Sequence, residues 1–144
     1  MYSPASTAAR AYAQVGIESD VIAASPHQLI VLLYQGAELS VRMAIRHIQD
    51  GELMKKSTAV TKAGSIIRDG LRAALDTGKG GELAGQLAAL YDYMDQRIML
   101  AHLQNDPAPL HEVLGLLREL REAWQAIGTS TRSTAPTFTH SVAA

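Results

Sequence analysis

Four stretches of this chain repeat apolar residues at the spacing of an α-helix. The most apolar of them lies between Gly81 and Asp106. Its expected core face consists of Leu83, Leu87, Leu90, Tyr91, Met94, Ile98 and Ala101. Further apolar residues lie on its other sides, with Tyr93 and Leu100 on one flank and Ala88, Met99 and Leu103 on the far side. A helix that is apolar nearly all round is either central in its fold or borders a groove for another chain, and we expect both.

Start and stop signals separate the periodic stretches into helices. Ser25-Pro26-His27-Gln28 combines an N-cap serine, a first-turn proline and a capping-box glutamine. Gly51, Gly78 and Gly128 each follow the end of a periodic stretch, and Asp106-Pro107 begins the last one. These signals predict helices at about 25–50, 52–77, 82–105 and 107–127.

Short connections make neighbouring helices antiparallel, so the pattern predicts an all-α, antiparallel up-and-down four-helix bundle over residues 25–128. Residues 1–24 are expected to form an N-terminal arm or short capping helix, with a small apolar cluster of Tyr12, Val15 and Ile17 that can dock on the bundle. Residues 129–144 are rich in Ser, Thr and Ala and are predicted to be disordered.

Composition restricts the partners. The 144 residues carry 13 Lys and Arg against 14 Asp and Glu, a net charge of -1, which offers no overall field for nucleic acid or anionic lipid. There is no cysteine for a disulfide or a thiolate metal site. No apolar run has the length of a signal peptide or a membrane span, so we expect a cytoplasmic protein without membrane insertion.

A search for reactive groups yields no catalytic constellation, metal site or cofactor site, and we expect no enzymatic activity. A di-metal bundle site needs a Glu three residues before a His, and none of the five histidines has one. The stretch 77–81 resembles a phosphate loop but Ala73 stands where the upstream glycine should be. A histidine phosphotransfer module centred on His102 is the alternative function, although Asn105 and Asp106 replace the Lys and Gly that follow the histidine in such modules.

Some apolar residues remain once the expected core positions are assigned, and we expect these to lie on the surface. Tyrosines give anchors, methionine adapts to different partners, and glycine allows close approach, which are features of an interaction groove. We predict a groove formed by Tyr91, Tyr93, Met94 and Leu100 with Ile66 and Gly70. The alternative is a bundle whose own arm and helices cover all of this surface.

At these residues the chain resembles the flagellar secretion chaperones, the FliS family. The likeness covers about residues 12–127, and its most specific piece is Leu90-Tyr91-Asp92-Tyr93-Met94 followed by Arg97. The other matching passages are Ser25 to Ile30 with Leu33 to Gly36, Lys79 to Ala84, and Glu112 to Trp124. Two positions depart from the family pattern: Gln35 replaces a frequent acidic residue, and Gln96 a frequent basic one.

The resemblance implies a cytoplasmic export chaperone that binds the disordered C-terminal segment of flagellin, which becomes helical on the chaperone. Polymerisation is blocked until the flagellar type III export apparatus takes the cargo. The implied flagellin-binding residues are Ile66, Gly70, Tyr91, Tyr93, Met94, Arg97 and Leu100, and Tyr12, Val15 and Ile17 belong to the arm that competes for the groove. Family members are also linked to the export gate and an anti-sigma factor. Whether the free protein is a monomer or a homodimer stays open.

Overall fold

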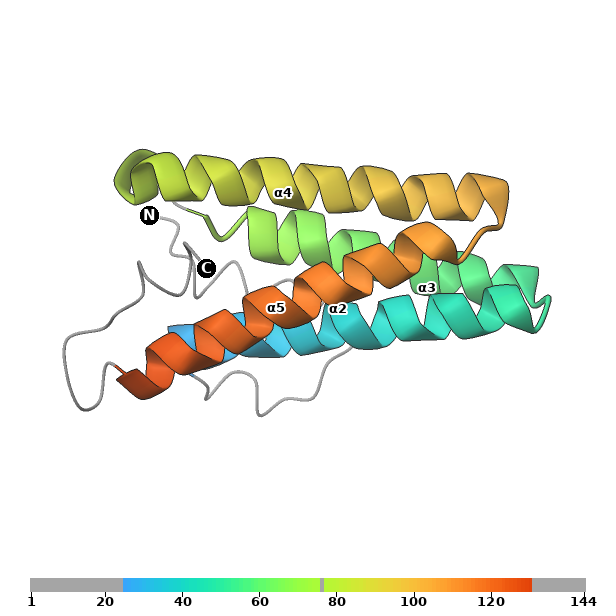
Figure 1. Cartoon of the computed structure of the whole chain (residues 1–144), viewed down its shortest axis with the longest axis horizontal. Helices are drawn as coiled ribbons and strands as arrows, with labels where there is room; N and C mark the ends of the chain where they lie inside the picture. The colour runs from blue at the N-terminus through green and yellow to red at the C-terminus, as the bar shows by residue number, and fades with distance from the viewer. Residues whose placement is uncertain (1–24, 76, 131–144) are drawn as a thin grey trace.

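The computed structural model describes residues 25–75 and 77–130, and these form an all-α, antiparallel four-helix bundle (Figure 1). Successive helices run in opposite directions along the long axis, which confirms the predicted fold class. The elements are α2 (Pro26–Gln49), α3 (Leu53–Ser65), η2 (Ile66–Arg72), α4 (Thr77–Gln104) and α5 (Ala108–Ser130). The predicted arm, with Tyr12, Val15 and Ile17, lies outside the described residues.

The start of α2 follows the predicted capping box. The Gln28 backbone N–H donates to the Ser25 hydroxyl at 3.2 Å, and the Ser25 backbone N–H donates to the Gln28 side-chain oxygen at 3.0 Å. Pro26 occupies the first turn, where its missing N–H leaves no hydrogen bond unmade. Gly51 follows the other end with a positive φ of 72°. The last helix, α5, continues past Gly128 to Ser130, two residues into the predicted tail.

The second predicted helix is not one continuous α-helix. At Ile66 the α-helix α3 changes to the π-helix η2, in which the Ala73 N–H donates to the Arg68 carbonyl five residues back. The wider turn brings Ile66, Ile67, Gly70 and Leu71 inward together. Two ion pairs of 2.7 Å, Arg68 to Asp95 and Arg72 to Asp92, link η2 to α4 from outside.

The glycine-rich stretch that we predicted as a turn contains a helical turn followed by a sharp change of direction. Within α4 only Gly81 has non-helical dihedrals, φ 59° and ψ -137°, and the regular helix follows it. A residue with a Cβ rarely adopts this combination, which explains why a glycine stands at the kink.

The core lies mainly around α2, which packs most extensively against α3 and α5. The second half of the predicted core face of α4 is confirmed, with Tyr91, Met94, Ile98 and Ala101 buried. Leu83, Leu87 and Leu90, in the first half, are only partly buried. Several small or apolar residues of the second predicted helix also lie inside the bundle: Ala59, Ala63, Ile66 and Gly70 are buried. Small side chains here let the helices of the bundle approach one another closely.

Leu53 and Ser57 share the helical spacing of the buried Val60 and Gly64, which predicts one inward stripe, yet both are exposed. The buried side chain in this part of α3 is instead Lys56, whose Nζ donates to the His102 carbonyl at 3.2 Å and to Asn105 Oδ1 at 3.0 Å. Lys56 therefore ties the first turn of α3 to the end of α4, and this turn of the helix is rotated relative to the predicted stripe.

A buried ion pair joins α2 to α5. Glu38, whose side chain is 4% exposed, accepts from Arg121 Nε at 2.6 Å and from Arg121 Nη2 at 3.3 Å. Arg121 Nη1 also donates to Gln125 at 3.1 Å. The pair is bidentate, and this geometry compensates well for the desolvation of a buried carboxylate.

Replacing Gly81 by alanine tests the kink. Because alanine is strained at this φ and ψ, G81A should lower the free energy of unfolding by about 1 to 3 kcal/mol. The matched control is Gly85→Ala in the same helix, where a Cβ meets nothing within 4 Å. The control should be neutral or stabilise by up to about 1 kcal/mol, since alanine favours a helix. Urea unfolding followed by circular dichroism measures both, and equal effects would contradict the assigned kink.

Candidate functional site

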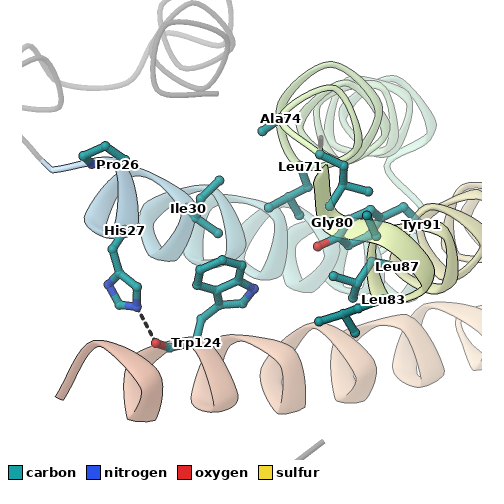
Figure 2. Close-up of a pocket in the computed structure, with 12 residues that line it drawn as sticks. Pro26, His27, Ile30, Leu71, Ala74, Gly80, Leu83, Leu87, Tyr91 and Trp124 are labelled. Atoms are coloured by element: carbon teal, nitrogen blue, oxygen red, sulfur yellow. Dashed lines mark hydrogen bonds between the residues drawn. The ribbon is translucent and has the colours of Figure 1, made fainter. Parts of the chain in front are cut away.

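An apolar pocket of about 370 Å³ lies at one end of the bundle, where four elements meet (Figure 2). It lies between the start of α2, the chain at the end of η2, the first turns of α4 and the last third of α5. Its lining consists of Pro26, His27, Ile30, Leu71, Ala74, Leu75, Gly80, Leu83, Ala84, Leu87, Tyr91 and Trp124. None of these is Asp, Glu, Lys or Arg. Such a site suits apolar side chains of a ligand.

His27 and Trp124 form the side of the pocket where α2 meets α5. The His27 Nε2 forms a hydrogen bond with the Trp124 carbonyl, drawn as a dashed line in Figure 2. The two rings also contact each other, with centroids 5.6 Å apart and planes tilted by 53°. A Cβ at Gly128 would overlap the His27 ring, so glycine allows this close approach of α5 to α2.

Two tyrosines form a buried hydrogen-bonded pair beside the pocket. The hydroxyl groups of Tyr34 and Tyr91 are hydrogen-bonded, and Tyr91 also lines the pocket. Burial raises the pKa of Tyr91 to about 12, and burial together with the neighbouring Tyr91 raises the pKa of Tyr34 well above its ordinary value. Both groups therefore stay neutral at physiological pH, and the apolar pocket carries no tyrosinate charge.

The structure does not assemble the predicted groove residues into one surface. Ile66, Gly70 and Met94 lie in the interior, where they pack in the core and are closed to a ligand. Our prediction placed them on a groove because periodicity marks a residue as apolar without showing which helix covers it. Tyr91 is also buried, at 2% exposure, and only its part in the pocket lining connects it to the surface.

The other predicted residues form a separate patch on α4 and α5. Tyr93 is 40% exposed, and its hydroxyl donates to Glu112 Oε2 at 2.6 Å. Arg97 Nε donates to the second oxygen, Glu112 Oε1, at 2.7 Å, and Leu100 lies half-buried one turn further on. The hydrogen bonds from Tyr93 and Arg97 lower the pKa of Glu112, which is thus a stable carboxylate. Arg97 positions the Tyr93 region through this shared partner.

Sequence reasoning did not single out the pocket or Glu112. Leu83 and Leu87 appeared only on an expected core face, Trp124 only in a passage that matches the family, and His27 only in a helix-start signal. The sequence feature that points to this pocket is the position of these apolar residues near the ends of their helices, where fewer neighbouring helices remain to cover them. Only the packing of four elements shows that the uncovered ends meet.

The described part of the chain contains no cluster of three or more His, Asp or Glu side chains suited to a metal ion. Within the same residues, none of the helices combines the length and hydropathy of a membrane span. His102, the centre of the phosphotransfer alternative, is half-buried, and its Nδ1 is buried without a hydrogen-bond partner among the described residues.

A helical bundle with an uncharged apolar pocket at its end has the architecture of a helical binding protein. The family model described as flagellar protein FliS matches residues 8–131 of the chain. The flagellar secretion chaperone FliS of Salmonella typhimurium is 48% identical over 118 residues, covering 82% of this chain and 87% of the relative. The Escherichia coli protein of the same name is 39% identical over 125 residues, covering 87% and 90%. The one from Bacillus subtilis is 32% identical over 108 residues, covering 75% and 79%.

The chain therefore belongs to the FliS family. The comparisons give no support to the phosphotransfer alternative.

The buried tyrosine pair predicts a loss of stability in alkali. An unfolded tyrosine ionises near pH 10, whereas folded Tyr91 keeps its proton up to about pH 12. The unfolded state releases the proton first, so the free energy of unfolding should fall as pH rises from about 10 to 12, by up to about 1.4 kcal/mol per pH unit for each such group. Urea unfolding between pH 8 and 11 measures this slope. Tyr91→Phe should reduce the slope, and an unchanged slope would show that Tyr91 does not stay neutral in the folded protein.

Proposed function

We propose that this protein is a cytoplasmic flagellar secretion chaperone that binds the disordered C-terminal segment of flagellin. In this proposal it keeps flagellin from polymerising and delivers it to the flagellar type III export apparatus. It acts by binding alone, without catalysis or a cofactor. The observation that carries the proposal is the apolar pocket at the end of the bundle. The chain belongs to a family whose relatives are named flagellar secretion chaperones, and such a pocket suits a chaperone that binds an apolar segment.

The pocket supports recognition of a segment that folds on binding. An amphipathic helix presents apolar side chains at intervals of three and four residues, and one or two of them fit a pocket of about 370 Å³. Coupled folding and binding buries on the order of 1,000 to 3,000 Å² and loses about 2 to 5 kcal/mol to ordering. Such a complex is specific and still releases its cargo.

The patch of Tyr93, Arg97 and Leu100 is a second contact for the same segment. Tyr93 offers a half-exposed ring held in place by Glu112, and a ring with few free rotations loses little entropy on binding. This patch and the pocket both lie on α4 and α5, so one segment that follows these helices can reach both.

The N-terminal arm is proposed to compete with flagellin for the pocket. Residues 1–24 join the bundle at Ser25, directly before Pro26, which lines the pocket. Tyr12, Val15 and Ile17 are apolar and lie 8 to 13 residues before this attachment. Attachment at the rim gives the arm a high effective concentration at the site.

Titration with a flagellin C-terminal peptide tests the chaperone proposal. The peptide should gain helix by circular dichroism, and the emission of Trp124 should shift, since this residue lines the pocket and is the only tryptophan in the chain. Leu83→Glu places a charge in the pocket and should weaken binding at least tenfold, about 1.4 kcal/mol. Leu103→Glu is the matched control on the same helix, because Leu103 is 75% exposed and far from the pocket lining.

Tyr93→Ala in the same titration examines the second contact, with Met99→Ala, a similarly exposed residue on the other flank of α4, as its control. A peptide that stays disordered in the presence of the folded protein would contradict the proposed function. Equal affinities for the Leu83 and Leu103 variants would remove the pocket from it.

Deletion of residues 1–20 tests the competing arm. If the arm covers the pocket, the shortened protein should bind the flagellin peptide more tightly or associate with it faster, because no displacement step remains. Stopped-flow fluorescence of Trp124 measures the association rate, and calorimetry measures the affinity. A shortened protein with unchanged rate and affinity would show that the arm does not occupy the site.

A further inference from the structure

A basic recess lies at the end of the bundle opposite the apolar pocket. It has a volume of about 500 Å³ and is lined by Arg42, Ile45, Arg46, Gln49, Asp50, His111 and Leu114. These residues come from the last turns of α2 and the first turns of α5, which lie together at the end of the bundle away from the start of α2 (Figure 1). Along α2, Ile45 is about 22 Å from Ile30 of the pocket at 1.5 Å per residue.

The recess concentrates positive charge in a chain whose net charge is -1. Arg42 and Arg46 lie one turn apart on α2, and His111 faces them from α5. The lining has one carboxylate, Asp50, and its contact with Arg46 is long, 3.6 Å, between side chains that are 80% and 49% exposed. Such an exposed pair is weak.

Arg42 differs from most other arginines of the described chain. Arg68, Arg72, Arg97 and Arg121 each have a carboxylate partner at 2.7 Å or less. Arg42 forms no ion pair or hydrogen bond with the residues that the structure describes, although it lines a recess. An exposed guanidinium in a recess is ready to pair with a carboxylate from another molecule, in the bidentate geometry that arginine favours.

The floor of the recess is apolar. Ile45 is buried and Leu114 is half-buried, and both line the recess together with the arginines and His111. A carboxylate attached next to an aliphatic side chain would match this arrangement, with the oxygens at the arginines and the side chain on the floor. The end of a polypeptide chain has this chemistry, because its α-carboxylate and its last side chains are adjacent.

We propose that this recess holds the C-terminal α-carboxylate of the bound flagellin segment. The inference rests on the proposed function and adds the orientation of the bound segment along the bundle. A segment with an apolar side chain in the pocket and its end in the recess needs about 15 helical residues to cover the distance between them. The end of the chain is then fixed by charge at one end of the bundle, and the apolar anchor lies at the other.

Two forms of one peptide test this inference by calorimetry. A flagellin C-terminal peptide with a free carboxylate should bind about tenfold more tightly than the same peptide with a C-terminal amide, because a charge-assisted hydrogen bond is lost. The double variant Arg42→Gln, Arg46→Gln should bind both forms with equal affinity. Lys62→Gln, which removes a positive charge on α3 away from the recess, should keep the tenfold difference, and raising the salt concentration should reduce that difference in the unmodified protein.

The outcomes separate this inference from the proposed function. If both peptide forms bind the unmodified protein equally, the recess does not hold the carboxylate, whereas the chaperone proposal stands. If replacing an acidic side chain of the peptide by its amide weakens binding and amidation of the terminus does not, the recess takes a side-chain carboxylate and the inference is overturned. If neither form binds the folded protein, the chaperone proposal fails and this inference fails with it.

Discussion

The packing of α5 across α2 is the constraint on which the rest of the structure depends. The buried carboxylate of Glu38 has its partner on the other helix, Arg121, and a buried charge without its partner is strongly destabilising. The two helices therefore cannot slide along each other without losing this pair. At one end of the same seam, His27 contacts Trp124 and Gly128, and at the other end the seam opens into the basic recess. The ion pair thus lies on the same seam whose two ends form the pocket wall and the recess.

The apolar pocket lies where two local irregularities, a π-helix and a kink, occur near one another. The π-helix η2 turns Leu71 inward and leaves Ala74 and Leu75 at the pocket wall. The kink at Gly81 redirects the chain before the regular part of α4 begins. Trp124 fills part of the space from α5 and does not close it. Straight helices of equal length would bury these apolar ends against each other, and no opening for a partner would remain.

The sequence predicts the helices well because their signals are local. Apolar spacing identifies the core face of α4, and the Ser25 to Gln28 capping box marks the start of α2 correctly. The π-helix leaves no such signal, since it differs from an α-helix by one extra residue in a turn and has no composition of its own. The sequence pattern also did not show that Glu38 is buried in an ion pair. A carboxylate in a helix is usually solvated, and its partner Arg121 lies 83 positions away.

The candidate site was predicted in part, for a physical reason. Tyr93, Arg97 and Leu100 do reach the surface together, since residues three and four apart share a helix face. Ile66 and Met94 lie in the core, and apolar spacing alone does not show whether a third helix or a ligand covers such a residue. The family resemblance implied the kind of partner that is proposed above. It could not supply the pocket, whose lining comes from four separate elements.

The two ends of the bundle differ in which chemical groups of a partner they recognise. An apolar pocket gains free energy from any side chain of suitable size, because the hydrophobic effect has no direction. It therefore tolerates sequence variation in a partner and cannot by itself fix the orientation of a helix. Two arginines around a recess favour an anionic group over a neutral one, and the α-carboxylate is an anionic group that only one end of a peptide carries. A surface that combines both can bind a variable segment firmly and still bind it in one direction.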